Sequence, residues 1–219
     1  MKKNIYAIID TETANGLYKP LVYDVSIIIF DRMGNEYFRK NWLISEVWDN
    51  KSLMNTAYYA WKMPLYKDFD VTLLDMSSFI EEFCGICSNY NVTHILAYNL
   101  PFDIRALHTT SKKYNQSEFI DENIIRQDVW GMACELLLNC KKYKDFCKEN
   151  GFISEKGNYK TSAECAYRFI TDNKEFEESH TSLSDCEIEK EIFMACLRKH
   201  KKYTVGIIYN PWRLIQDKE

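Results

Sequence analysis

Carboxylates and one histidine occupy three short patches of this sequence, and their types and spacing fit metal-dependent hydrolysis. Asp10 and Glu12 are two residues apart, Asp103 lies far along the chain, and Asp185 follows His180 by five residues. Hard cations such as Mg²⁺ and Mn²⁺ prefer carboxylate oxygens. Two such ions, about 3.5–4 Å apart, can generate a nucleophilic water and stabilise the leaving oxygen of a phosphodiester. A neutral histidine beside them can take the proton of that water as a general base.

Each of these residues also has an ordinary structural explanation, which the sequence leaves open. Asp10 could cap the turn after its strand, and Glu12 could point to solvent. A carboxylate at Asp103 would be favoured by the positive end of a helix, and Asp185 could reach water from the first turn of its own helix. His180 lies in a stretch rich in serine and threonine and could simply be exposed. The metal hypothesis therefore requires that all five converge.

Asp185 gives the clearest indication of a buried site. On a helix it shares one face with Ile188, Ile192 and Cys196, which should turn toward the core. A carboxylate on such a face needs a partner, because an isolated buried charge is costly. A metal ion held jointly with Asp10 would be such a partner.

The first strand would place two of the carboxylates. Asn4–Asp10 is apolar on both faces, which is typical of a central strand covered on both sides. Because side chains alternate along a strand, Asp10 and Glu12 are expected on the same side of the sheet. Val22–Phe30 and Glu36–Ile44, joined by a turn at Met33-Gly34-Asn35, predict an antiparallel meander with the first strand.

The rest of the chain alternates helical and strand patterns. Together with the meander they predict an α/β domain, with a mixed sheet of antiparallel and parallel strands and helices on both faces. No repeat or linker divides the chain, so we expect a single domain over residues 1–219. The pattern predicts strands at Thr93–Tyr98 and Ile124–Asp128, a loop at Gly151–Tyr159, and helices at Ser77–Tyr90, from about Pro101, at Val129–Cys140, Lys142–Glu149 and Thr161–Thr171, and from about Ser182 to Lys199.

Composition narrows the class of protein. The chain has 219 residues, of which 46% are hydrophobic and 27% charged, as in ordinary globular proteins. Its apolar runs are too short to span a bilayer, and no signal-peptide pattern follows the basic start, so a cytoplasmic location is expected. The net charge of −4 argues against a protein that grips duplex DNA by backbone neutralisation alone.

The remaining cysteines, histidines and lysines fit structural roles better than a site. Eight cysteines in such a chain indicate reduced thiols, and the Cys84–Cys87 pair lacks the second pair that a zinc site needs. Three lysine groups could steer a nucleic-acid strand, although charge runs are more often solvated helix faces. The other histidines are His94, His108 and His200, and the lysine groups are Lys112 with Lys113, Lys141 with Lys142 and Lys144, and Lys199 with Lys201 and Lys202.

Taken together, the three patches resemble the motifs of the DEDDh exonucleases of the ribonuclease H-like superfamily. The patches are Ile8–Thr13, Asn99–Asp103 and His180 with Asp185. A sister branch has tyrosine four residues before the last aspartate, where this chain has Thr181, so the histidine branch is favoured. The group includes proofreading subunits of bacterial replicative polymerases, ribonuclease T, oligoribonuclease and small bacteriophage exonucleases. The segment 131–159 is longer than a minimal member would need.

This resemblance implies a role for each residue. Asp10, Glu12, Asp103 and Asp185 would bind two Mg²⁺ or Mn²⁺ ions, with Asp10 bridging both, and His180 would be the general base. The expected activity is 3′→5′ hydrolysis of single-stranded DNA from its 3′ end, releasing 5′-mononucleotides. An exoribonuclease or oligoribonuclease is the nearest alternative, and a non-catalytic module that binds nucleic acid or a replication polymerase is another. The expected contacts to the substrate strand are Thr11, Thr13, Asn99 and Phe102.

Overall fold

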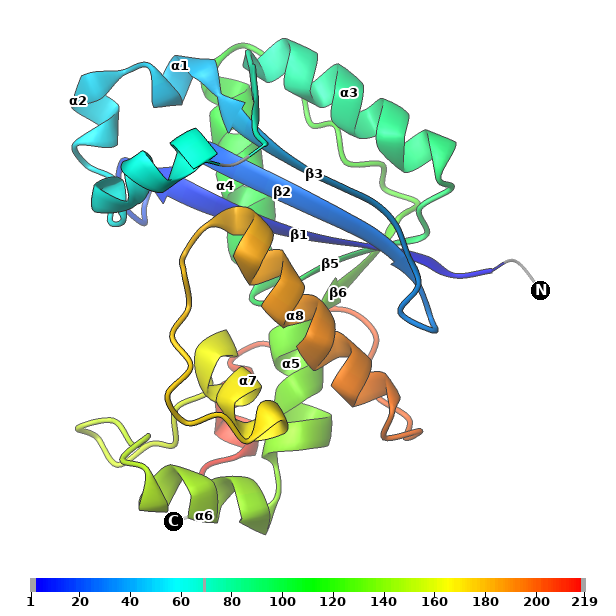
Figure 1. Cartoon of the computed structure of the whole chain (residues 1–219). Coiled ribbons are helices and arrows are strands. Elements are labelled where there is room, and N and C mark those ends of the chain that lie inside the picture. The colour runs from blue at the N-terminus through cyan, green and yellow to red at the C-terminus, as the bar shows by residue number, and fades with distance from the viewer. Residues whose placement is uncertain (1–2, 69, 218–219) are drawn as a thin grey trace.

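A six-stranded mixed sheet forms the centre of the structure, in the order β4-β3-β2-β1-β5-β6 (Figure 1). The computed structural model describes residues 3–68 and 70–217. β2 pairs antiparallel with both β1 and β3, whereas the β3–β4, β1–β5 and β5–β6 pairs are parallel. The predicted mixed sheet is therefore confirmed. Its strands are β1 (Ile5–Ala14), β2 (Leu21–Asp31), β3 (Glu36–Ile44), β4 (Thr72–Leu74), β5 (His94–Ala97) and β6 (Ile125–Asp128).

β1 is longer than the sequence predicted, and this changes the setting of its two carboxylates. The expected strand ended at Asp10, but β2 is long enough to pair with β1 as far as Ala14. In this ladder Asp10 is opposite Ser26 and Glu12 is opposite Asp24, and the register shifts directly after Glu12. Both carboxylates therefore lie within the strand rather than beyond its end.

Helices cover both faces of the sheet, as expected. On one face Ile9 packs in a core cluster with Phe83 of α3 and Leu107 of α4. On the other face Ile8 packs with Ile192 of α8, and α7 lies against α8 (Figure 1). The α-helices are α1 (Ser45–Trp48), α2 (Lys51–Met54), α3 (Met76–Asn89), α4 (Leu100–Lys113), α5 (Val129–Ala133), α6 (Lys141–Glu149), α7 (Ala163–Thr171) and α8 (Ser182–Leu197). Two 3₁₀ segments, η1 (Ala60–Asp68) and η3 (Pro211–Leu214), and one π-helical turn, η2 (Cys134–Leu138), complete the fold.

The π-helical turn η2 and the edge strand β4 were not predicted from the sequence. The expected helix over Val129–Cys140 is α5 followed by the π-helical turn η2. Over so few residues, the spacing of apolar side chains does not distinguish the wider π turn from an α turn. The edge strand β4 was not predicted, because three residues are too short for a recognisable alternation.

The thiols are unpaired. All eight cysteines lie among the described residues and are free. Cys84 and Cys87 both lie in α3, and burial raises the pKa of both thiols, that of Cys87 to about 12. Such thiols are poor nucleophiles and poor metal ligands at neutral pH. In the described part of the chain, no helix combines the length and the apolar character that a membrane span requires.

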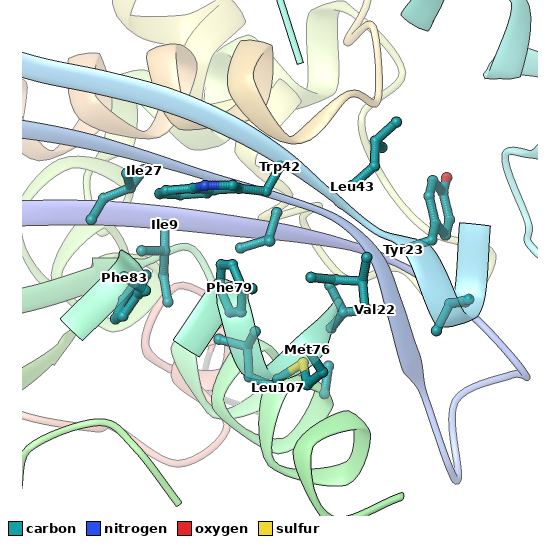
Figure 2. Packing of buried hydrophobic residues seen from close by; sticks show 14 of the residues in the cluster. Ile9, Val22, Tyr23, Ile27, Trp42, Leu43, Met76, Phe79, Phe83 and Leu107 are labelled. Carbon is teal, nitrogen blue, oxygen red and sulfur yellow. The ribbon is translucent and has the colours of Figure 1, made fainter. Parts of the chain in front are cut away.

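Trp42 of β3 anchors the core between the sheet and α3. It is fully buried, and its ring meets that of Phe79 edge-on at a centroid distance of 5.4 Å (Figure 2). Phe83 lies on the same helix, 6.5 Å from the Trp42 ring. Aromatic pairs of this kind contribute beyond the area that they bury.

We expect Trp42→Ala to destabilise the protein by about 3–5 kcal/mol, because it leaves a cavity among aromatic side chains. Urea unfolding followed by far-UV circular dichroism measures this. Leu73→Ala is the control, since Leu73 of β4 is 48% exposed and its loss should change stability by no more than about 0.5 kcal/mol. Equal effects of the two substitutions would contradict this view of the core.

Candidate metal centre

Three elements bring metal-binding side chains to one place. Glu12 lies in β1, Asp185 lies in the first turn of α8, and His180 lies in the loop just before α8. One ligand atom from each of these residues lies within 4.8 Å of the other two. Among residues 3–68 and 70–217, no other histidine, cysteine or acidic side chains gather in this way.

Asp10 and Asp103 lie beside this trio rather than within it. Asp103, in the first turn of α4, is 3% exposed and accepts a 2.8 Å hydrogen bond from the hydroxyl of Thr11. Burial raises the pKa of Asp10 well above its usual value, and the charges of Asp185, Asp103 and Glu12 raise it further. The predicted carboxylates therefore form one electrostatic cluster.

The cluster holds more acidic groups than the protein could balance if all of them were ionised. Burial raises the pKa of Glu12 to about 9, and the nearby Asp185, Asp24 and Asp103 charges add to the effect. Burial likewise raises the pKa of Asp185 to about 8 and that of Asp103 to about 7. Oxygen Oδ1 of Asp185 is also buried without a hydrogen-bond partner. Clustered carboxylate oxygens with an unsatisfied member suit a hard divalent cation such as Mg²⁺ or Mn²⁺.

The aromatic ring of Tyr59, the residue directly before η1, holds His180 in place. Its imidazole stacks on the ring of Tyr59 at a centroid distance of 4.1 Å and an interplanar angle of 11°. Its backbone adopts a positive φ of 52°, which is uncommon for a non-glycine residue. Burial, and then the charge of Lys62, lower the pKa of the imidazole. The ring is therefore neutral at physiological pH, as a general base must be.

Lys62 is a cation in the centre that the sequence gave no reason to select. It lies in η1, is 7% exposed, and its Nζ donates a hydrogen bond to the carbonyl oxygen of Ser179, next to His180. Its charge lowers the pKa values of Glu12 and Asp185, against the larger effect of burial. Lys62 thus ties η1 to the histidine loop and offsets part of the negative charge. Nothing in its immediate sequence distinguishes it from a surface lysine.

Asp24 of β2 fixes the start of α8 and was also missed. It is fully buried, and it accepts hydrogen bonds from the Ser182 amide at 2.9 Å and the Ser182 hydroxyl at 2.6 Å. It also accepts hydrogen bonds from Asn41 and Tyr66. Asp24 is opposite Glu12 in the ladder, so it links the strand beside Glu12 to the helix that carries Asp185. An acidic residue within a largely apolar strand was the feature of the sequence that could have indicated it.

A second buried aspartate, Asp128, accepts hydrogen bonds at the starts of two helices. Asp128 accepts hydrogen bonds from the amides of Asn99 and Leu100 at the start of α4, and from the amide of Gly131 in α5. Asn99 occupies the cap position with a φ of 72°, and its side chain makes no capping hydrogen bond. The Asn99 side chain is exposed, directly before the helix that carries Asp103.

The other predicted substrate contacts differ in exposure. Thr11 is 6% exposed and its hydroxyl is committed to Asp103, whereas Thr13 is partly exposed. Phe102 is partly buried, with the Arg105 guanidinium 5.4 Å from the centre of its ring. Thr11 therefore orients a carboxylate, and Thr13, Asn99 and Phe102 remain candidates for direct contact.

The lysine groups and the other histidines lie away from the centre. Lys112 and Lys113 end α4, roughly 14 Å along the helix from Asp103 at 1.5 Å per residue. The group from Lys199 lies past the end of α8, while Lys141, Lys142 and Lys144 lie in α6. Elsewhere, His94 packs on Tyr6 at 4.9 Å, His108 pairs with exposed Glu118, and His200 is exposed after α8.

Similarity to known proteins is found in the fold and not in the sequence. No protein-family profile matches the sequence, and no curated protein matches it. Solved structures do share the fold, which is of the ribonuclease H-like α/β type. Cell-death related nuclease 4 superposes with a TM-score of 0.57 at 13% identity, over 90% of this chain and 64% of that one.

Two further structures give similar values. The zinc-bound complex of E. coli ExoI with single-stranded DNA has a TM-score of 0.58 at 16% identity, over 91% of this chain and 41% of that chain. A full-length 3′-exonuclease has a TM-score of 0.58 at 9% identity, over 91% of this chain and 84% of that chain. The chain thus spans less than two thirds of the length of the first two proteins. At these identities the likeness establishes the fold alone.

The raised pKa values predict that the metal-free protein loses stability as pH rises from about 5 to about 9. The unfolded carboxyls lose their protons near pH 4, whereas folded Glu12 and Asp185 keep theirs to about 9 and about 8. Between these limits the folded state binds more protons, so the free energy of unfolding falls with pH. Melting temperatures measured in EDTA test this, with Asp185→Asn expected to flatten the profile. A metal-free melting temperature that rises over this range would contradict the cluster.

Proposed function

We propose that this chain is a metal-dependent 3′→5′ exonuclease that removes 5′-mononucleotides from single-stranded DNA. The observation that carries the proposal is the convergence of Glu12, Asp185 and His180, with Asp10 and Asp103 beside them. This convergence occurs on a fold shared with exonucleases. Because the fold alone does not fix an activity, the site geometry is the main argument. The proposal treats residues 1–219 as one catalytic domain.

Each residue has a distinct task in this proposal. Asp10, Glu12, Asp103 and Asp185 would hold two Mg²⁺ or Mn²⁺ ions, with Asp10 shared between them. Bound in this way, the ions would acidify a water and stabilise charge on the phosphate and on the leaving 3′-oxygen. His180 would accept the proton of the attacking water, since its imidazole is neutral and lies at the edge of the trio.

The surroundings of the centre favour a single strand over a duplex. Thr13, Asn99 and Phe102 are proposed to contact the terminal nucleotides. Beside Tyr59, the rings of Tyr58 and Trp61 are 83% and 71% exposed, and exposed aromatic rings can stack on unpaired bases. The net charge of −4 leaves little affinity for duplex backbone alone. E. coli ExoI, a structural neighbour, has been solved in complex with single-stranded DNA.

The proposal also includes a cellular compartment and a partner protein. Free thiols suit a reducing compartment such as the cytoplasm. A replication polymerase is the partner that the family resemblance implies. Neither is needed for the chemistry, which the residues above supply.

Incubation with 3′- and 5′-labelled single-stranded DNA and RNA tests the activity, its direction and its sugar preference together. With Mg²⁺ or Mn²⁺, a 3′ label on DNA should be released at once as a mononucleotide, while a 5′ label should pass through a ladder of shortened strands. EDTA and Asp10→Ala should each abolish both results. Faster cleavage of RNA would favour an exoribonuclease, and binding without cleavage would identify a non-catalytic module.

His180 and Tyr59 should affect the rate in different ways. His180→Ala removes the proton acceptor and should lower kcat by about 10²–10⁴-fold. Tyr59→Ala removes the ring against which the imidazole stacks, and a misplaced base can cost up to about 10²-fold in rate. Tyr59→Phe keeps that ring and should retain the wild-type kcat. Single-turnover cleavage of a short oligonucleotide measures all three, and a wild-type rate for His180→Ala would exclude the histidine base.

A further inference from the structure

Glu189 is a buried acidic residue of α8 that none of the predicted motifs contains. It lies one helical turn after Asp185, so both side chains lie on the same face of the helix. Glu189 is 3% exposed, and its oxygen Oε2 is buried without a hydrogen-bond partner. In the described residues the only other such side-chain atom is Oδ1 of Asp185. One helix face therefore presents two unsatisfied carboxylate oxygens to the same region.

The neighbours of Glu189 belong to the metal centre. Its charge acts on Asp10 more strongly than any other charge does, and the charges of Asp103 and Asp185 act on Glu189 in turn. The backbone amide of Tyr98, the residue after β5, lies close enough to the Glu189 carboxylate to lower its pKa, against the larger effect of burial. Within the described part of the chain, no lysine, arginine or histidine forms an ion pair with it.

An apolar side chain would serve better at this position if packing were its only role. A buried carboxylate without a counter-ion is destabilising, and replacing such a group by a well-packed apolar residue is often neutral or stabilising. The helix also has ample apolar contact nearby, since Ile188, Ile192 and Phe193 are all buried. The position of Glu189 therefore makes physical sense when a cation completes it.

We propose that Glu189 is a fifth carboxylate of the metal centre, binding a divalent cation through Oε2 on the Asp10 side of the cluster. The Tyr98 amide would hold the carboxylate in place while Oε2 stays free for the ion. This inference rests on the metal centre of the proposed function and extends its ligand set beyond the four predicted acids. It predicts tighter cation binding than those four acids alone would give.

Mn²⁺ binding to the full-length chain, measured by titration calorimetry and by electron paramagnetic resonance of free Mn²⁺, tests this directly. Glu189→Gln has the same shape and keeps an oxygen for the Tyr98 amide, but it loses the charge. We expect it to weaken Mn²⁺ binding by about 10–100-fold. The matched control is Glu187→Gln on the same helix, because Glu187 is half exposed and pairs with Arg39 instead. The control should bind Mn²⁺ as the wild type does.

Thermal unfolding provides a second readout that does not depend on activity. Without metal, Glu189→Gln and Glu189→Leu should melt at or above the wild-type temperature, because each removes a buried carboxylate. With saturating Mn²⁺, both should gain less in melting temperature than the wild type does. Glu189→Leu keeps the test valid if the glutamine variant folds poorly.

The outcomes separate this inference from the proposed function. If the wild type binds Mn²⁺ and cleaves DNA while Glu189→Gln binds Mn²⁺ equally well, Glu189 is not a ligand and only the inference is overturned. If the wild type binds no divalent cation, the metal centre and the inference fail together. Weaker binding in Glu189→Gln with normal binding in Glu187→Gln supports the fifth ligand.

Discussion

Repulsion between buried carboxylates is the constraint on which the rest of this structure depends. Asp10, Glu12, Asp103 and Asp185 come from three elements, and burial raises the pKa of every one of them. Lys62 is the cation whose charge opposes this effect at Glu12 and Asp185. A chain that gathers so many like charges must hold them by other interactions, or the elements that carry them would separate. In the proposed function, divalent cations would balance the charge of this cluster.

The elements are held together by two other buried aspartates, Asp24 and Asp128. Asp24 links β2 to the start of α8, and Asp128 links β6 to the starts of α4 and α5. Asp128 accepts hydrogen bonds from three backbone amides at helix N-termini, and Asp24 accepts one, from Ser182. A carboxylate is stabilised at such a position. The helices that carry Asp103 and Asp185 are thereby anchored to the sheet at their N-terminal ends, where these two carboxylates lie. Tyr59, directly before η1, and Lys62, within η1, then position His180 and its loop.

Local patterns predicted much of this arrangement, and long-range contacts account for what they missed. Alternation along β1 correctly put Asp10 and Glu12 on one side, and the apolar face of α8 correctly marked Asp185 as facing inward. Neither pattern carries information about a lysine that reaches its partner across 117 positions in the chain. Glu189 was missed because a single acidic residue in a helix is ordinary until its burial is known. The structural neighbours, at 9–16% identity, retain the same fold although little of the sequence is shared.

The central claim is that these carboxylates exist to bind divalent cations, and crystals grown with Mn²⁺ test it most directly. Anomalous difference maps locate the ions without reference to any assumed activity. The account predicts strong peaks enclosed by Asp10, Glu12 and Asp185, with His180 beside them. Maps without a peak in this cluster, at Mn²⁺ concentrations that saturate the protein in solution, would contradict it.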